Sequence, residues 1–518
     1  MHDSAWPVLL SAVLCAASAY AYTRRRKARL PALPPSPKSD PIIGHLRYMP
    51  TQNEEAVYKA WGQELNSSII SLQVLGQVVI VLNSIEDAQE LLVKRSLIYS
   101  DRPQLEMLSN PKLTGWGNGS AVLNYGERWR GQRKLKHEVL HKKASRLFWP
   151  TMTKQARLAM QRILDNPQNF AAEISRMTGV TILSSAYGYN ALTADDPMVK
   201  IVKVGMKSFS DAAVPGSFLV NTLPWLQYVP SWFPGAGWKR KIATWRKEQE
   251  AMMNTPFIWT KEQIAAGTAQ PSVVDSLLTK LKAHPPSTHS AEEEEDRIKW
   301  ATGSLYGAAS DTSSSAVLVF MLAMLRHPDV QYRAQREIDA VVGDQRLPEM
   351  EDRDHLPYVD RIVKEVMRWR PVVPLGVAHA SAQDDTYRGY HIPKGAIVLI
   401  AWGYSMGNIW AMCNDPNVYA NPEQFDPDRF LDPSVPEAPA FGFGRRSCPG
   451  IHFAEASLFI TISTMLAVFD VKPVLDSQGN DVIPDAEMSP ESLVRFPLDF
   501  ECTMRPRSEA RAKLLLQH

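Results

Sequence analysis

One cysteine near the C-terminus constrains this chain more than any other feature. It is Cys448, in the run Phe441-Gly-Phe-Gly-Arg-Arg-Ser-Cys-Pro-Gly450. So much glycine disfavours the interior of a helix or strand. The apolar segment that follows predicts a helix from His452 to about Phe469. The sequence therefore predicts a loop that presents a single thiol just before a helix.

The surroundings of Cys448 suit a thiolate that binds iron. Such a thiolate is a strong electron donor and favours O–O cleavage. Gly444 and Gly450 allow amide groups to approach the sulfur, and the positive end of the following helix lowers a thiol pKa. Arg446 is placed to meet an anionic group of a cofactor. The alternative is an ordinary glycine–proline turn with an incidental cysteine, which explains the whole pattern less well.

The pattern F-x-x-G-x-R-x-C-x-G is present in full, at Phe441, Gly444, Arg446, Cys448 and Gly450. With it, the chain resembles the cytochrome P-450 superfamily. The resemblance covers nearly the whole body, from Ile42 to about Arg507. It implies a mainly α fold with a small β region, in which Cys448 is the axial ligand of the haem iron.

The composition excludes several other classes of protein. A formal net charge of +2 over 518 residues offers no bulk attraction to nucleic acid. The cysteines form no C-x-x-C pair, which argues against a disulfide framework or a structural zinc site and suits a reducing compartment. They are Cys15, Cys413, Cys448 and Cys502.

The N-terminus predicts a membrane anchor. Ala5–Tyr22 is uncharged and close to the lower length limit for crossing a bilayer. The basic run Arg24–Arg29 follows it, which places the rest of the chain in the cytosol. A cleaved signal peptide is the alternative, but its charge should precede its apolar run. The prolines between Pro31 and Pro41 form a stiff segment that resembles the hinge of microsomal family members.

We therefore divide the chain into three parts. Residues 1–23 are the membrane anchor helix, residues 24–44 a basic stop and proline-rich hinge, and residues 45–518 a single haem-thiolate monooxygenase domain. The resemblance implies a single-pass protein of the endoplasmic reticulum membrane with a cytosolic catalytic domain. We expect it to be monomeric. Within the body, alternation over Ile69–Leu82 predicts a hairpin that turns at Gly76.

A long helix is predicted over Ser290–Leu325, and its middle carries the polar run Gly307-Ala-Ala-Ser-Asp-Thr312. Oxygen activation at iron needs two protons, and Asp311 and Thr312 supply an acid and a hydroxyl. The alternative is a threonine that bonds back to a carbonyl one turn earlier. The family usually has glycine where this chain has Ala309.

Three charged residues are predicted to support the cysteine loop. Glu365 and Arg368 are three apart and share a helix face, although such pairs are common on protein surfaces. Arg429 stands where the family has an arginine that joins this pair. The resemblance therefore implies a buried, charge-assisted triad with a structural role.

The two propionates of haem need donors. Trp129 and Arg133 lie four apart on a basic helix predicted over Tyr125–Lys143, and they match the family's W-x-x-x-R. His379 stands where the family often has His or Arg, although an ordinary polar strand residue is the alternative. Arg446 is the fourth candidate.

Basic residues around these positions predict a docking surface for an acidic redox partner. The chain has no G-x-G-x-x-G fingerprint and no flavin site, so its electrons come from another protein. The resemblance points to an NADPH-dependent diflavin reductase in the same membrane. The basic residues are Arg128, Arg130, Lys134, Lys136, Lys142, Lys143 and Arg445.

The substrate region is the least defined part of the sequence. We expect an apolar pocket with walls from Leu105 to Trp116, Phe209 to Val220 and Ser492 to Phe496. Leu223–Pro234 is too apolar and proline-rich for a surface helix. It either dips into the membrane as an access gate or packs in the interior.

An insertion relative to the family falls at about Ile400–Met406. It is either a genuine elaborated loop or an artefact of gene-model splicing. If it falls inside the strand after Lys394, it disturbs the sheet beside His379.

The leading hypothesis is a monooxygenase with haem b that inserts one oxygen atom of O2 into a hydrophobic small molecule. Tyr99–Pro103, Tyr125–Trp129 and Asn408–Ala411 look most like fungal (basidiomycete) members, many of which modify secondary metabolites such as terpenoids. One alternative is a haem-thiolate isomerase or dehydratase, against which the pair Asp311 and Thr312 argues. The other is a non-catalytic haem-binding protein, if the insertion disrupts the site.

Overall fold

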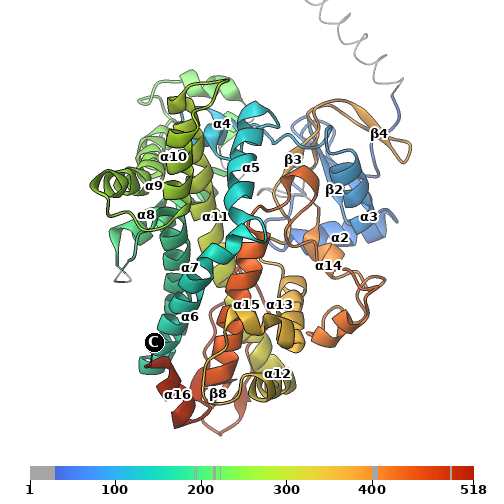
Figure 1. Cartoon of the computed structure of the whole chain (residues 1–518). Coiled ribbons are helices and arrows are strands. Elements are labelled where there is room, and N and C mark those ends of the chain that lie inside the picture. Colours follow the sequence, from blue (N-terminus) through green and yellow to red (C-terminus); the bar gives the residue numbers. More distant parts are fainter. Residues whose placement is uncertain are drawn as a thin grey trace, which may run out of the picture.

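A computed structural model describes residues 30–191, 193, 195–213, 218–221, 223–398, 407–490 and 493–517. Helices make up most of this part, and the strands gather mainly on one side (Figure 1). The expected mainly helical fold with a small β region is confirmed. The predicted anchor and the insertion at Ile400–Met406 lie outside the described residues.

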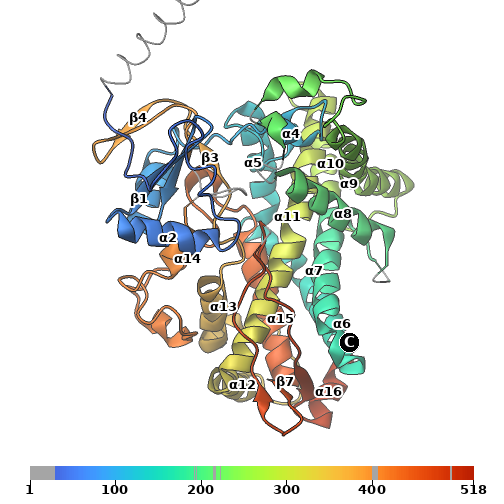
Figure 2. The same ribbon diagram turned by 180° about the vertical axis from the view of Figure 1, so that it is seen from behind.

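Helix α11, Ala291–Arg326, runs through the middle of the molecule (Figures 1 and 2). It begins after Ser290, whose hydroxyl accepts a hydrogen bond from the amide of Glu293. This cap and the acidic first turn satisfy the positive end of the helix dipole. Helix α15, Ile451–Val468, packs against α11 and begins directly after the cysteine loop. Both helices lie close to their predicted positions.

Most of the other described α-helices lie around this central pair, and a few lie beside the strands (Figure 1). In chain order they are α2 (Glu54–Glu64), α3 (Ile85–Ala88), α4 (Glu106–Ser109), α5 (Glu127–Leu140), α6 (Trp149–Asp165), α7 (Phe170–Tyr187), α8 (Pro197–Ala213), α9 (Trp238–Ala266), α10 (Val273–Ala283), α12 (Pro328–Val341), α13 (Pro357–Trp369), α14 (Ile409–Cys413) and α16 (Glu509–Leu515). A π-helix, Gln89–Lys94, continues α3.

The largest sheet has the strand order β1-β2-β6-β3. Its strands are β1 (Ile69–Val74), β2 (Gln77–Leu82), β6 (Ile397–Val398) and β3 (His379–Ala380). Leu75 and Gly76 both have positive φ angles, as a two-residue hairpin turn of type I′ requires. The hairpin is therefore where the alternating pattern placed it.

Short antiparallel pairs complete the β structure. They are β4 (Asp385–Tyr387) with β5 (Tyr390–Ile392), β7 (Phe469–Lys472) with β10 (Thr503–Pro506), and β8 (Val474–Leu475) with β9 (Asp481–Val482).

The described part of the proline-rich segment is hydrogen bonded to the β region. Ser71 donates its amide to the carbonyl of Pro35 and its hydroxyl to that of Pro34, and the amide of His391 donates to Ala32. These bonds fix the start of the described chain against β1 and β5.

Two described helices are long and apolar enough to cross a membrane, Ala291–Arg326 and Ile451–Val468. They are α11 and α15, and most of each apolar window is buried inside the protein. Their apolar character is therefore explained by the core that they form.

The connection between α8 and α9 carries large apolar side chains into solvent. Trp232 is 80% exposed and Tyr228 is 75% exposed, and Trp225 and Phe233 are exposed as well. This contradicts the alternative that Leu223–Pro234 packs in the interior. In Figures 1 and 2 this segment lies at the same end of the molecule as the start of the described chain.

Candidate functional site

A largely apolar cavity of about 340 Å³ lies between α5, α7, α11, β3 and the cysteine loop. Most of the predicted site residues line it together, although they come from distant parts of the sequence. They are Trp129, Arg133, Thr312, His379, Phe441, Arg446, Cys448 and Gly450.

The cysteine loop is held by backbone contacts. The amide of Cys448 donates to the carbonyl of Phe441 at 2.8 Å, and the amide of Gly450 lies 3.4 Å from the sulfur. Gly444 has φ +57°, and a Cβ there would stand 2.1 Å from the carbonyl oxygen of Leu92. Only glycine fits at this position, because both the conformation and the space exclude a side chain.

The thiol of Cys448 faces the cavity, to which its side chain is exposed. Its position deep within the protein raises its pKa. The amide of Gly450 and the charge of Arg133 act in the opposite direction. Burial outweighs both, so the expectation of a lowered thiol pKa is wrong for the protein chain alone. A bound cation would reverse this balance, since metal coordination deprotonates a thiol.

Helix α11 forms one wall of the cavity. Ser304, Ala308 and Thr312 recur every four residues and therefore share one face. The hydroxyl of Thr312 donates to the carbonyl of Ala308 at 2.9 Å. This is the back-bond that the structural alternative described, but it occurs on a threonine that also faces the cavity.

Asp311 is half-buried and is not among the residues that line the cavity in the described part of the chain. Burial raises the pKa of its carboxyl group, and the charge of Lys203 partly opposes this. Burial thus makes this carboxyl group, which is next to Thr312 in the sequence, a weaker acid than an exposed aspartate.

Four cationic side chains line the cavity: Arg102, Arg133, Lys136 and Arg446. Its lining within the described residues contains no Asp or Glu. The four cationic side chains donate mainly to carbonyl oxygens. For example, Arg102 donates to the carbonyl of Ala378, and Arg133 donates to the carbonyl of Ser447. Burial lowers the pKa of each of the four groups.

Arg446 is held by three carbonyl groups, those of Ser100, Ser120 and Leu123. Burial lowers its pKa to about 9, although Asp101 partly offsets this. Carbonyl groups satisfy the N–H donors but carry no full charge. The cavity therefore retains an excess of positive charge.

His379 lies in β3 and is fully enclosed. Its Nδ1 is hydrogen bonded to the carbonyl of Tyr99, while its Nε2 is buried without a partner. A buried polar atom without a partner calls for an explanation, and His379 lines the cavity, where a bound group could meet this nitrogen. The strand neighbour of His379 is Val398 in β6, so the described sheet beside it is intact up to that residue.

Two cavity cations were not recognised from the sequence as part of the site. Lys136 was assigned to the docking surface, which is wrong, because it is buried on the inner face of α5. Arg102 lies within the motif Tyr99–Pro103, but no role in the site was predicted for it. Periodicity pointed to Lys136, which lies three residues after Arg133 and thus on the same helix face.

The rest of the basic group is at the surface. Arg128 is paired with Asp296. The remaining members are exposed: Arg130, Lys134, Lys142, Lys143 and Arg445.

Glu365, Arg368 and Arg429 meet in a buried cluster. Arg368 binds both carboxylate oxygens of Glu365, at 2.7 and 2.8 Å, and Nε of Arg429 lies 3.1 Å from Oε1. Both arginines also donate to backbone carbonyls between Cys413 and Gln424. The triad therefore ties α13 to the segment that leads into the cysteine loop.

The expected substrate walls, Leu105 to Trp116, Phe209 to Val220 and Ser492 to Phe496, do not line this cavity in the part of the chain that the structure describes. Met107, Leu108, Leu113 and Trp116 belong to the hydrophobic core and not to the cavity lining. Helix α7 and the segment after α13 supply walls that no sequence pattern predicted. They include Ile182, Ser185, Ala186, Val372, Val373 and Val377.

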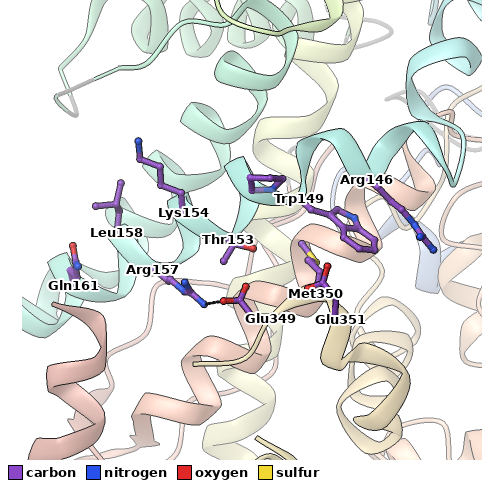
Figure 3. Close-up of a pocket in the computed structure, with 11 residues that line it drawn as sticks. Arg146, Trp149, Thr153, Lys154, Arg157, Leu158, Gln161, Glu349, Met350 and Glu351 are labelled. Atoms are coloured by element: carbon purple, nitrogen blue, oxygen red, sulfur yellow. Dashed lines mark hydrogen bonds and ion pairs between the residues drawn. The ribbon is translucent and has the colours of Figure 1, made fainter. Parts of the chain in front are cut away.

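A second cavity, of about 490 Å³, lies at the surface between α6 and the turn at Glu349–Glu351. Figure 3 shows Arg157 reaching across it to Glu349, at 2.6 Å. None of the predicted site residues lines it. We therefore place the candidate site in the smaller cavity.

A deep thiol before a buried helix, facing a polar interruption of a long central helix, defines a haem-thiolate type of site. The family model for cytochrome P450 matches residues 34–497, and the chain belongs to this family. The chain is 41% identical to cytochrome P450 monooxygenase 208 of Postia placenta, and the alignment covers 99% of this chain and 97% of the relative. It is also 36% identical to cytochrome P450 monooxygenase ARMGADRAFT_974139 of Armillaria gallica, over 95% of both chains. The expected likeness to basidiomycete members is confirmed.

Proposed function

We propose that this protein is a haem-thiolate monooxygenase that oxidises a hydrophobic small molecule with O2. One observation carries the proposal: the Cys448 sulfur and the Thr312 hydroxyl face the same apolar cavity. Haem, when bound, supplies the oxygen activation and the oxidising power.

The residues of the cavity fit a haem group. Cys448 would bind the iron, and its loop geometry leaves the sulfur accessible. The unbalanced cations and the unpartnered Nε2 of His379 would meet the two carboxylates of the porphyrin. Thr312 and Asp311 would hold and move protons on the α11 side. Phe441, Gly444 and Gly450 shape the loop around the sulfur.

The exposed cations of α5, of the turn that follows it and of the cysteine loop support an external electron source. Arg130, Lys134, Lys142, Lys143 and Arg445 form a basic surface that an acidic protein can recognise. We propose an NADPH-dependent diflavin reductase as this partner.

The exposed aromatic residues between α8 and α9 support contact with a membrane. Trp and Tyr side chains favour the interface between lipid and water. Together with the anchor predicted at residues 1–23, this supports a location at the endoplasmic reticulum membrane with the body in the cytosol. A lipid-soluble substrate, such as a fungal terpenoid, suits that location and the apolar cavity.

Spectroscopy and turnover test this proposal together. The reduced protein with carbon monoxide should give the thiolate-type band, and Cys448→Ala should abolish it. With reductase and NADPH, candidate substrates should gain one oxygen atom by mass spectrometry. Product formed without NADPH would instead indicate an isomerase or dehydratase, and absence of the band would refute the haem-thiolate site.

A further inference from the structure

Lys136 is a buried cation on α5. It takes part in no ion pair among the described residues. Its exposed fraction is 5%, and it lines the cavity that also holds Cys448. Its Nζ donates to the hydroxyl of Ser120 at 2.5 Å. A hydroxyl group satisfies one donor but does not neutralise the charge.

The position of Lys136 is tightly determined. It lies seven residues after Trp129 and three after Arg133, so the three share the inner face of α5. The Ser120 hydroxyl donates in turn to Gln132, and the Ser120 carbonyl accepts from Arg446 at 3.2 Å. Lys136 and Arg446 are thus held by the same residue.

Burying an ammonium group without an opposite charge is costly. Here the pKa of Lys136 is lowered to about 7, mainly by burial and in part by the charges of Arg133 and Arg446, while Cys448 acts in the opposite direction. Lysine is also more strongly hydrated than arginine, so its burial is harder to compensate by carbonyl groups. A carboxylate inside the cavity would balance the charge. Haem brings two carboxylates to this cavity.

We propose that Lys136 binds a carboxylate of the haem, as a further cation beside Arg133 and Arg446, and that its charge raises the reduction potential of the iron. The inference rests on haem binding, which the proposed function requires, and not on turnover. A positive charge near the iron favours the form that has gained an electron.

Haem loss to an excess of apomyoglobin tests the contact. Lys136→Met should release haem roughly 10-fold faster, as loss of one charge-assisted hydrogen bond predicts. Its reduction potential should be more negative. Lys136→Arg should restore both properties in part. Lys134→Met, at an exposed lysine on the same helix, should show wild-type haem loss and reduction potential, because neither measurement involves the reductase.

Haem dimethyl ester, which lacks both carboxylates, separates this contact from a structural role. With it, wild type and Lys136→Met should lose the group at equal rates, because the coupled partner is already absent. A difference that persists with the ester would overturn the proposal. The proposal would also be overturned if Lys136→Met lost haem at the wild-type rate and kept the wild-type reduction potential. This includes the outcome in which the variant only binds laurate, a carboxylic acid substrate probe, more weakly.

A second charge-free variant guards against misfolding. Lys136→Gln has a different shape from Lys136→Met, and the potential is measured only on molecules that contain haem. Both variants should show the same negative shift. A shift in only one of them would overturn the electrostatic role. If the protein retained haem but formed no product in the monooxygenase assay, the conclusion about Lys136 and the haem carboxylate would still stand.

Discussion

The guanidinium of Arg446 lies over the indole ring of Trp129, with its carbon 4.4 Å from the ring centroid. One residue comes from the cysteine loop and the other from α5. Together with the hydrogen bond from Arg133 to the Ser447 carbonyl, this contact joins the helix to the loop that carries Cys448. A change at either residue should therefore affect the ligand loop.

Trp129→Leu should weaken the attachment of the loop. The stacked cation contributes about 2 kcal/mol when it is desolvated, and this should appear as lower haem occupancy and a lower denaturation midpoint. A double-mutant cycle with Arg446→Met measures the coupling. Additive effects in the cycle would show that the stacking contributes nothing. Trp225→Leu, at an exposed tryptophan, is the control.

Thr312→Ala should leave the carbon monoxide band unchanged but separate NADPH consumption from product formation. We expect the product per NADPH to fall by about 10-fold or more, because a positioned proton donor is lost. Thr302 provides a matched control, since its hydroxyl bonds back to Ile298 in the same helix at 2.9 Å and is fully buried. Equal coupling in Thr312→Ala and Thr302→Ala would contradict the proton role.

Glu365→Gln should destabilise the protein by about 3–5 kcal/mol, because two buried guanidinium groups lose their only shared carboxylate among the described contacts. Urea denaturation of the haem-loaded protein measures the loss. Glu509→Gln breaks an exposed pair with Lys513 and should change stability by less than about 1 kcal/mol. A similar small loss in Glu365→Gln would argue against the triad as a support.

Asp311→Asn should increase stability at neutral pH while it impairs turnover. The folded-state pKa of Asp311 is raised by burial, so its ionisation favours the unfolded state. The cost is absent below the unfolded pKa of about 3.9. It grows as the pH rises and is complete above the folded pKa. The melting temperatures of the wild type and Asp311→Asn should be measured from about pH 3.5 upward, a range set by that reference value. They should diverge as the pH rises. Parallel curves would disprove the raised pKa of Asp311.

The exposed aromatic segment should contact lipid. In nanodiscs with brominated phospholipid, the full chain should show quenched tryptophan fluorescence. Replacing Trp225 and Trp232 by phenylalanine should remove part of this quenching, whereas Trp410→Phe should not. Unchanged quenching in the double variant would show that the segment remains in water.

Local patterns predicted the local structure well. The apolar run after Gly450 gave α15, the alternation around Gly76 gave a hairpin, and the spacing of Glu365 and Arg368 placed both on one face of α13. Each of these depends on residues within a few positions of one another. The relation of Arg429 to that pair came from the family motif alone.

Tertiary contacts were less accessible. The charge of Lys136 suggested a surface, since lysine is seldom buried, and only the fold shows Ser120 and the cysteine loop around it. The walls from α7 carry no motif, because Ile182 and Ala186 are ordinary core residues until a neighbouring cavity is known.

The cations of the cavity also bear on how the protein is made. Four like charges face one space, so the newly synthesised polypeptide is least stable before the porphyrin enters it. Cofactor binding then shifts the folding equilibrium by mass action. The amount of intact enzyme in a cell should accordingly follow the rate of porphyrin biosynthesis, and chains that miss their cofactor become substrates for protein quality control.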